Sequence, residues 1–490
     1  MSELAARVEQ FADAHGCVGI AVGLIRAGQP VTTINRGVAS LGDRVPIDSR
    51  SVFRAGSISK LFTGIAVMQL VEEGTLELDE PANTHLDRFE LRTPANGTGI
   101  TLRHLLTHTS GIGELRRATD LFRPVIGMAS EPGRPIPDLG DYYAPALSAR
   151  QPAGERWAYA NHGFATLGAI VEDVTGESFA IRVRRTILDP LGMDHSDFTR
   201  TERVSARLVD GHAALFGRSR RVDDRDIIPA PAGSLFTCVD DLARFVTMMG
   251  GDGPQVLSRA LLDEMVTPQW RIHPALAAMG LAFMVDDVAD TQTVMHDGGL
   301  PGFVSHVRVA TAGGVGVVIL TNSASTAIGM DIAGFGKDLI DDATGATVER
   351  AVPIPNHRDR WHELSGAYRL EPGLNSNARA WMLLGGEVEV MVRDDTLMLR
   401  SFTGPARIAC RLRPVDPNDP LVFEFTVGES TIRVAFGTDV IHIGLPLNVT
   451  LHRRTRGFRK RARLAAGGVL AAASAAVALQ LVTARTHPDR

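Results

Sequence analysis

Hydrophobic positions along this chain change their spacing several times, and each change predicts a different element. Residues 1–15 mix apolar with acidic and basic positions in the manner of an amphipathic helix. An apolar run at 18–25, a turn at 27–30 and a second short run predict a β-hairpin. Residues 58–73 then place apolar side chains three and four positions apart, which predicts a helix that Gly74 closes.

A change of pattern after residue 340 predicts a second, strand-rich domain. Asp and Pro residues at 341–360 indicate a linker, which we bound at 346–360, after a first domain at 1–345. Two-residue alternation of apolar and polar positions then recurs at 388–392, 397–399, 422–425, 432–434 and 440–443. This period predicts a small antiparallel β-barrel within 361–452, with a structural or substrate-gating role.

The end of the chain has a pattern of its own. Basic residues crowd 453–463, and the following stretch, 464–484, contains no charged residue and is long enough to cross a bilayer. Basic residues beside an apolar span mark its cytoplasmic side, and residues 1–15 lack the apolar core of a secretory signal. We therefore expect a C-terminal membrane helix that tethers a cytoplasmic catalytic body. A soluble cytoplasmic protein is the alternative.

The composition is that of a globular protein. The chain has 490 residues, a formal net charge of -5 and 44% hydrophobic residues, which excludes a disordered or nucleic-acid-coating protein. Its cysteines, Cys17, Cys238 and Cys410, form no C-x-x-C pair and are expected to be reduced thiols. Neither a disulfide framework nor a cysteine zinc site is indicated.

The rarity of lysine draws attention to one position. Lysine occurs only at 60, 337 and 460, although the chain has 51 Lys and Arg residues in total. Arginine keeps its proton at working pH, whereas a lysine in apolar surroundings can lose its charge and act as a base. Lys60 follows Ser57 by three residues at the start of the apolar helix, so both side chains can share one helical face. This S-x-x-K stretch predicts an activated serine nucleophile, with a capped helix start as the structural alternative.

Two further stretches carry groups that suit the same chemistry. In Tyr159-Ala160-Asn161, side chains two apart in extended backbone point the same way, so a phenol and a carboxamide can face one substrate. The stretch His296-Asp297-Gly298-Gly299 precedes two predicted strands, 304–309 and 315–320, and glycines beside a strand let the backbone approach a ligand. One of their N–H groups and that of Ser57 could form an oxyanion hole. Each stretch alone is also compatible with an ordinary turn or strand end.

A pair of histidines offers a metal-binding alternative. His104 and His108 are four residues apart on a predicted short helix, a spacing that can hold zinc. Leu105 stands where an H-E-x-x-H site carries its glutamate. The sequence therefore favours histidines that bond backbone groups around a packed turn, and no cofactor or metal is expected.

Taken together, these stretches resemble the penicillin-binding-protein and class C β-lactamase-related serine hydrolases. The resemblance lies in the S-x-x-K motif at 57–60, the Y-x-N motif at 159–161 and the third motif, in its H-x-G form, at 296–298. Segments outside the three motifs also resemble the family. They are Phe53-Arg54-Ala55-Gly56, Leu105-Leu106-Thr107-His108-Thr109-Ser110-Gly111, Pro190-Leu191-Gly192-Met193 and Pro231-Ala232-Gly233-Ser234 before Asp240-Asp241-Leu242-Ala243.

The resemblance implies an α/β sandwich, in which an antiparallel sheet lies beside an all-helical region with the active site between them. It implies that Ser57 is the acylated nucleophile and that Lys60 and Tyr159 share the general base and acid work. The oxyanion hole would consist of the Ser57 and Gly299 N–H groups. The substrate-binding residues that it implies are Asn161, His296, Gly298 and Gly299.

The predicted function is hydrolysis of an ester or amide through an acyl-enzyme, by an esterase or a D-amino-acid-type peptidase. Class C β-lactamases generally carry K-T-G at the third motif, and H-x-G looks more like the family's esterases and D-peptidases. A β-lactamase or D,D-carboxypeptidase is the first alternative, against which a cytoplasmic body argues because peptidoglycan lies outside. A catalytically inactive penicillin-binding-like scaffold is the second. The expected partner is a small ester, amide or peptide substrate, and no nucleic acid.

Overall fold

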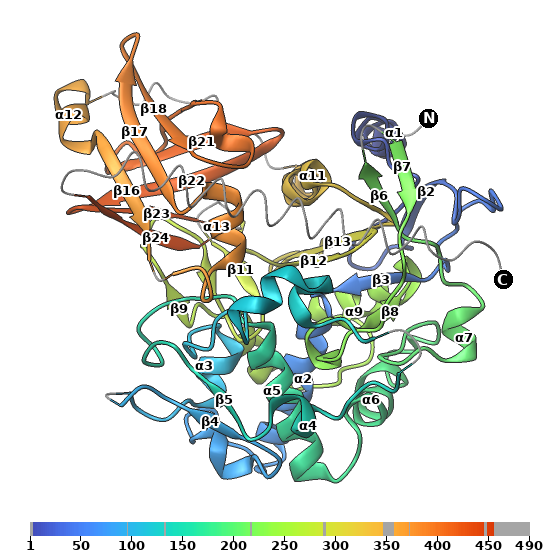
Figure 1. Cartoon of the computed structure of the whole chain (residues 1–490). Coiled ribbons are helices and arrows are strands. Elements are labelled where there is room, and N and C mark those ends of the chain that lie inside the picture. The colour runs from blue at the N-terminus through green and yellow to red at the C-terminus, as the bar shows by residue number, and fades with distance from the viewer. Residues whose placement is uncertain are drawn as a thin grey trace.

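The computed structural model describes residues 3–95, 97–131, 134–215, 218–287, 291–345, 357–371, 373–444 and 448–454. Most of this chain builds a large antiparallel sheet with helices on both faces, and a second strand-rich body lies beside it (Figure 1). The N-terminal hairpin pairs with a strand from the other end of the first body, because β1 lies against β14. In order across the sheet, the strands are β2 (Thr32–Gly37), β1 (Gly19–Ile25), β14 (Gly316–Thr321), β13 (Phe303–Ala310), β12 (Thr293–Leu300), β11 (Met284–Asp286), β10 (Ala278–Met279) and β9 (Trp270–Arg271).

Each face of this sheet has its own helical layer and its own core. On one face, α1 (Glu3–His15) and α11 (Thr326–Thr344) pack together, with the Phe11 and Phe335 rings stacked at 4.4 Å. The larger core lies on the other face. The helices on that side are α2 (Ser59–Glu72), α3 (Leu102–Leu106), α4 (Leu139–Tyr143), α5 (Asn161–Thr175), α6 (Phe179–Val183), α7 (Glu202–Ser205), α8 (Ala230–Gly233), α9 (Val239–Met249) and α10 (Arg259–Val266).

Short strands form three smaller sheets outside the main one. The pairs are β3 (Phe53–Gly56) with β8 (Leu235–Thr237) and β4 (Glu90–Arg92) with β5 (Ala146–Ser148), and a three-stranded set joins β6 (His212–Leu215), β7 (Arg218–Arg221) and β15 (Ser323–Ala324). Strand β3 leads directly into α2. Apolar residues occupy every side of α2, so it is buried along almost its whole length, as expected for a helix that is hydrophobic all round.

The C-terminal strands form a nine-stranded antiparallel sheet that curls into a nearly closed barrel around a separate apolar core. In sheet order they are β19 (Cys410–Arg411), β18 (Thr396–Ser401), β17 (Glu387–Arg393), β16 (Gly366–Leu370), β24 (Val449–Arg453), β23 (Val440–Ile443), β22 (Ser430–Gly437), β21 (Val422–Val427) and β20 (Arg413–Pro414). Helix α12 (Trp361–Leu364) precedes β16, and α13 (Ala378–Leu384) lies between β16 and β17.

One of the contacts between the barrel and the first body is at α11. The turn before β22 lies on this helix, where Ser430 Oγ donates to the Met330 carbonyl and Glu429 N donates to Asp331 Oδ1 at 3.1 Å. Asp331 Oδ2 is also 3.0 Å from His15 Nε2, so one buried carboxylate joins α1, α11 and the barrel. These polar contacts fix the barrel, and α13 with it, relative to the sheet.

The predicted antiparallel sheet beside helices and the predicted C-terminal barrel are confirmed, and one local prediction is wrong. Residues 341–344, where the Asp and Pro signal begins, form the last turn of α11, and Lys337 Nζ supports that turn by pairing with Asp341 at 2.5 Å. Gly298 and Gly299 lie inside β12 instead of before a strand. Pairing with β13 and packing against β3 outweigh the low strand propensity of glycine here.

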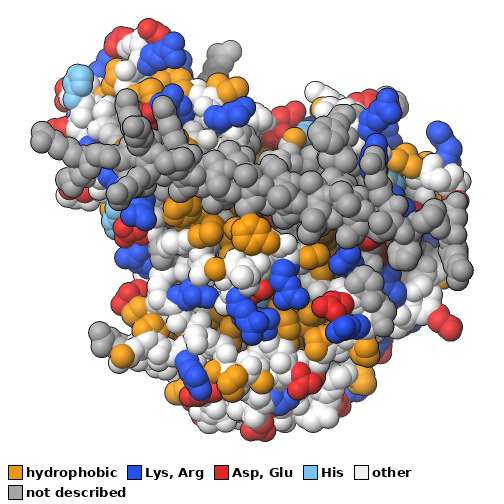
Figure 2. All heavy atoms as spheres, in the orientation of Figure 1, with side chains coloured by type: hydrophobic (Ala, Val, Ile, Leu, Met, Phe, Trp, Pro, Cys, Tyr) orange, Lys and Arg blue, Asp and Glu red, His pale blue; other side chains and the backbone are white. Residues whose placement is uncertain are grey.

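The predicted membrane helix at 464–484 lies outside the described residues and stays a prediction, as do the linker residues 346–356. Within the described ranges, no helix combines the length and the apolar character needed to cross a bilayer. Over the lower part of the face in Figure 2, basic and acidic side chains are interspersed with apolar ones.

Candidate active site

Ser57 lies in the turn between β3 and α2, at the border of the larger core. Strand β3 ends at Gly56, whose φ of 53° lies in the left-handed region that favours glycine. A Cβ atom on Gly56 would lie 2.9 Å from Gly299 N, so this glycine lets the end of β3 approach β12. Helix α2 begins at Ser59, two residues later. Ser57 is only partly buried, and a substrate can therefore reach it.

Lys60 occupies the first turn of α2 with its amine directed at Ser57. Nζ lies 3.0 Å from Ser57 Oγ, and it also donates to Asn161 Oδ1 at 2.8 Å and to the Ala232 carbonyl at 2.7 Å. The side chain is fully buried, and none of these three acceptors carries a charge. Burial, with a smaller contribution from the positive Arg379, lowers the pKa of Lys60 well below its usual value. The amine can therefore be neutral and accept the Ser57 proton.

Tyr159 lies beside this pair, just before α5. The Ser57 side chain lies close enough to the Tyr159 phenol to lower the pKa of that group slightly, and Lys60 Nζ is 4.9 Å from the Tyr159 ring centroid. Burial raises the pKa of Tyr159 to about 12, so at neutral pH the phenol keeps its proton and can donate it. Extended backbone at Ala160 lets both Tyr159 and Asn161 face Lys60.

His296 forms a neutral wall on β12. Its ring is 1% exposed and lies 6.3 Å from the Tyr159 ring, and its Nδ1 is 2.7 Å from the Asp297 carbonyl oxygen. Burial, with the nearby Lys60 adding to it, lowers the pKa of His296 to about 4. The imidazole therefore carries no charge near neutral pH. The Asp297 carboxylate instead pairs with His306 on β13, at 2.6 Å from its Nδ1.

The two glycines of β12 have different surroundings. A Cβ on Gly298 would lie 2.0 Å from the Ala55 carbonyl oxygen and 2.2 Å from Ser305 Oγ. Ser305 Oγ itself donates to that carbonyl at 2.8 Å, so β3, β12 and β13 meet at this point. A Cβ on Gly299 would meet no heavy atom within 4 Å. Open space therefore lies on the Cβ side of Gly299, and its N lies close to Gly56, the residue before Ser57.

His104 and His108 bond backbone groups, as the structural interpretation predicts. His108 is fully buried, its Nδ1 accepts from Ala160 N at 3.1 Å, and its ring packs on Tyr159 at 4.3 Å. His104 Nδ1 accepts from Thr101 N at 3.2 Å within the N-terminal cap of α3. Within the described part of the chain, no group of three His, Cys, Asp or Glu side chains is placed to hold a metal ion.

Two charged residues that the sequence patterns did not single out also belong to this site. Arg379, on α13 of the barrel, places its Cζ 3.9 Å from the Tyr159 ring centroid. Glu114 fixes it, because Glu114 Oε1 accepts from Arg379 Nε at 2.5 Å and Oε2 accepts from Arg379 N at 2.7 Å. Glu114 is 3% exposed, whereas the Arg379 side chain is 49% exposed. The two residues are 265 positions apart and belong to no repeated pattern, so no local signal could have paired them.

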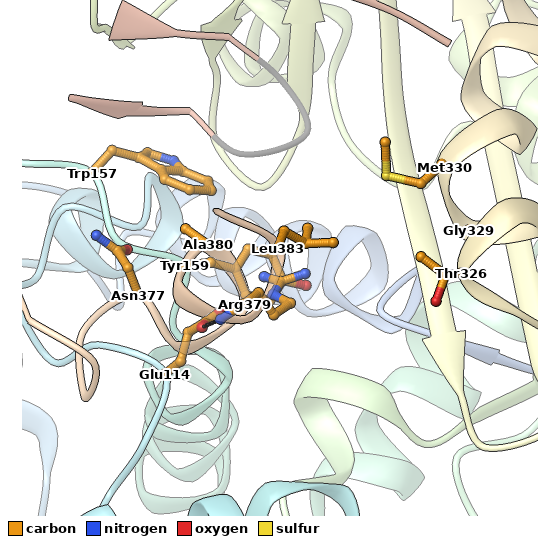
Figure 3. Close-up of a pocket in the computed structure, with 10 residues that line it drawn as sticks. All are labelled: Glu114, Trp157, Tyr159, Thr326, Gly329, Met330, Asn377, Arg379, Ala380 and Leu383. Atoms are coloured by element: carbon orange, nitrogen blue, oxygen red, sulfur yellow. Dashed lines mark hydrogen bonds and ion pairs between the residues drawn. The ribbon is translucent and has the colours of Figure 1, made fainter. Parts of the chain in front are cut away.

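A pocket of about 210 Å³ opens between the barrel and the first body, with Tyr159 in its wall. Figure 3 shows the Glu114 and Arg379 side chains meeting beside Tyr159, with the α11 residues on the opposite side. Apolar side chains such as Trp157, Met330 and Leu383 make up much of the pocket lining. The lining residues are Glu114, Trp157, Tyr159, Thr326, Gly329, Met330, Asn377, Arg379, Ala380 and Leu383.

An antiparallel sheet between two helical layers, with a serine and a buried lysine at the start of its central helix, defines the class of serine hydrolases to which penicillin-binding proteins and class C β-lactamases belong. The sequence assigns the chain more narrowly, because residues 4–334 match the Beta-lactamase family. The chain belongs to this family. The resemblance seen in the motifs is therefore confirmed.

Relatives with known names agree with this membership. Penicillin-binding protein 4 of Amycolatopsis lactamdurans is 27% identical over 358 residues, which cover 69% of this chain and 89% of the relative. The octameric penicillin-binding protein homologue from Pyrococcus abyssi superimposes with a TM-score of 0.62 at 24% identity, over 92% of this chain and 100% of its own. EstCE1, a hydrolase with promiscuous acyltransferase activity, superimposes with a TM-score of 0.59 at 21% identity, over 69% of this chain and 98% of its own. At these identities, the two structures establish a shared fold.

Gly298→Ala is expected to lower both stability and activity. The added methyl group has no room between the Ala55 carbonyl and Ser305 Oγ, so β12 must move away from β3. Overpacking of this kind lowers the free energy of unfolding by about 1–3 kcal/mol, and displacement of β12 is expected to lower kcat/KM at least about tenfold. Urea unfolding and ester hydrolysis measure the two effects.

Gly299→Ala is the matched control for the stability effect. The added methyl group would meet open space, and we expect an unfolding midpoint close to that of the unchanged protein. Equal midpoints for the two variants would contradict the close contact between β12 and β3.

Proposed function

We propose that this protein cleaves a small ester or amide through an acyl-enzyme formed on Ser57. The observation that carries the proposal is the 3.0 Å contact between Ser57 Oγ and a fully buried Lys60 amine. A lysine that serves only as a structural cation has no need of an uncharged environment. Here the acceptors around Nζ are neutral and burial lowers the pKa, so the amine is suited to take a proton.

In the first half of the proposed reaction, neutral Lys60 takes the proton of the Ser57 hydroxyl as Oγ attacks the substrate carbonyl carbon. The carbonyl oxygen becomes negative, and the Ser57 and Gly299 N–H groups, at the adjoining ends of β3 and β12, are the proposed donors to it. Asn161 Oδ1 accepts a hydrogen bond from Lys60 Nζ, so the NH₂ group of Asn161 is left to orient the substrate.

Loss of the leaving group needs a proton, and we assign its delivery to Lys60 through the Tyr159 phenol. The phenol keeps its own proton at neutral pH and contacts Ser57, so it can donate to the leaving oxygen or nitrogen while the protonated lysine restores it. Water then attacks the acyl-enzyme, with the same groups working in the reverse sense. Ser57 is thereby released.

The proposed substrate class follows from the surroundings of Ser57. His296 is neutral, so the third motif offers no positive charge to the carboxylate of a lactam antibiotic. The pocket next to Tyr159 is mainly apolar and suits an acyl group or an apolar side chain. These features favour esters over lactams. The similar fold of EstCE1, a hydrolase with acyltransferase activity, adds an analogy in the same direction.

A D-amino-acid-type peptidase is the second candidate, and Arg379 favours it. Its side chain is half exposed in the pocket, and Glu114 contacts only its Nε and backbone N among the hydrogen bonds of the described residues. The outer guanidinium N–H groups can therefore donate hydrogen bonds to the carboxylate of a peptide-like substrate. β-Lactamase or D,D-carboxypeptidase activity and an inactive scaffold remain the other outcomes of the test.

A hydrolysis screen distinguishes these candidates. The substrates are p-nitrophenyl butyrate, a D-alanine p-nitroanilide and a chromogenic cephalosporin. We expect the highest kcat/KM for the ester, and turnover of the cephalosporin at least about a hundredfold slower, because no cation of the third motif binds its carboxylate. Faster turnover of the cephalosporin than of the ester would contradict the proposal. No turnover of any substrate, together with no labelling by a fluorophosphonate, would favour the scaffold.

A further inference from the structure

The C-terminal barrel places a permanent positive charge against Tyr159, the proposed proton donor of the catalytic domain. Arg379 Cζ lies 3.9 Å from the Tyr159 ring centroid, and Lys60 Nζ lies 4.9 Å from the same centroid. The phenol thus lies within reach of two basic groups, the Lys60 amine from α2 and the Arg379 guanidinium from α13. An arginine keeps its proton at any working pH, so the Arg379 charge is always present.

The other titratable groups around Lys60 and Tyr159 do not provide such a charge. His108, at the end of α3, and His296, on β12, are neutral near pH 7 because burial lowers both pKa values. The Asp297 carboxylate, also on β12, pairs with His306. Glu114 is negative and partly offsets Arg379, but for the pKa of Tyr159 the effect of Arg379 is the larger of the two.

We propose that Arg379, which the barrel supplies, keeps the Lys60–Tyr159 couple one proton short of full protonation. The couple can then accept the Ser57 proton when Oγ attacks the substrate. This inference rests on the proposed hydrolase function. A nearby cation disfavours the ammonium form of Lys60 and favours loss of a proton from Tyr159, so both effects remove a proton from the couple. Because Lys60 and Tyr159 interact, the proton that is lost belongs to the pair and not to either residue. Its loss appears as the acid limb of the profile of kcat/KM against pH.

The geometry of the Glu114 contact supports this role. Glu114 is buried and binds the Nε side and the backbone N of Arg379, which fixes the guanidinium over the ring. The barrel itself is held on α11 by the contacts of Ser430 and Glu429. A charge at a set position requires such support, since a mobile arginine would turn towards solvent. Arg379 acts through Lys60 and Tyr159, and we class it as a positioning residue.

The test is the pH profile of kcat/KM for p-nitrophenyl butyrate, a substrate without charge, across roughly pH 5–10. Loss of the cation in Arg379→Gln favours the protonated couple and raises its apparent pKa. We expect the acid limb of the profile to move up by about one pH unit, with rates about tenfold lower below the limb and similar rates above it. Arg379→Lys, which keeps the charge, is expected to retain the limb within about half a unit.

Glu114→Gln provides an independent variant with the opposite sign. It removes the negative charge but keeps an acceptor for Arg379, so the acid limb is expected to move down. If Arg379→Gln does not fold, as judged by thermal unfolding, the Glu114→Gln profile decides alone. Arg358→Gln is the matched control, because Arg358 also stacks on an aromatic ring of the barrel, at 5.8 Å from the Trp361 centroid, but outside the site. It should leave the profile unchanged.

The outcomes separate this inference from the function on which it rests. An acid limb that stays in place in both Arg379→Gln and Glu114→Gln would overturn the inference, whether or not the rates fall. A shift in the same direction in both variants would also overturn it and indicate a merely structural pair. If the unchanged protein neither hydrolyses the ester nor reacts with a fluorophosphonate at Ser57, the proposed function itself fails.

Discussion

Ser57→Ala is expected to lower kcat/KM for p-nitrophenyl butyrate by at least roughly a thousandfold, as removal of the nucleophile does in other nucleophile–base units. The substitution removes the Oγ atom that contacts Lys60 Nζ at 3.0 Å and leaves no group to form the acyl-enzyme. It should leave the fold intact, since Ser57 precedes α2 and is only partly buried. Steady-state kinetics and covalent labelling with a fluorophosphonate measure the effect.

Ser205→Ala is a suitable control for the labelling experiment. Ser205 is exposed on α7 and belongs to none of the segments that form the proposed site, so the variant should label and hydrolyse as the unchanged protein does. Labelling that persists in Ser57→Ala would mean that another residue is the nucleophile. Undiminished turnover in that variant would rule out the acyl-enzyme proposed on Ser57.

Lys60→Arg is expected to cause a loss of similar size, at least roughly a thousandfold in kcat/KM. Arginine preserves the positive charge, but it cannot release its proton and so cannot accept one from Ser57.

The neutral lysine proposed as the base also predicts how the activity of the unchanged protein depends on pH. Because the proposed base works in its neutral form, activity should rise with pH through the lowered pKa of Lys60 and be lost as the pH falls below it.

A matched control comes from the other lysine in the described part of the chain. Lys337 lies on α11 and pairs with Asp341 at 2.5 Å, so Lys337→Arg retains its contact and should leave kinetics unchanged.

A second variant of the proposed base is Lys60→Met. It removes the amine but keeps most of the apolar stem, so it tests the loss of the base with a side chain suited to a buried site. Retention of most activity by Lys60→Arg would count decisively against the assignment of Lys60 as the base.

The position of Arg379 changes the role expected of the C-terminal barrel. The strand pattern alone suggested a module without chemistry of its own, and the strands do build a separate apolar core. Helix α13, however, interrupts the barrel between β16 and β17 and carries Arg379 to the face of Tyr159. Removal of the barrel would therefore remove a charge from the site as well as one wall of the pocket.

Several elements could be predicted because their signals are local. Alternating apolar positions at 388–392 and 397–399 predict β17 and β18, since side chains of a strand alternate between two faces. Spacings of three and four predict α2, and Gly74 with its φ of 72° follows the end of that helix. The glycine-rich stretch in β12 was misjudged, because its strand partners lie elsewhere in the chain and local propensity does not include them.

By itself, the sequence determined that Ser57 and Lys60 can meet, because their spacing within one helical turn is a local property, and the resemblance of its motifs indicated the family. Only the tertiary structure decided that Lys60 is fully buried among neutral acceptors from three segments, and this burial is the physical cause of its lowered pKa. It alone decided that Arg379 and Glu114, 265 residues apart, meet beside Tyr159. Such a contact depends on how the barrel docks on α11, a packing outcome that no local pattern of residues encodes.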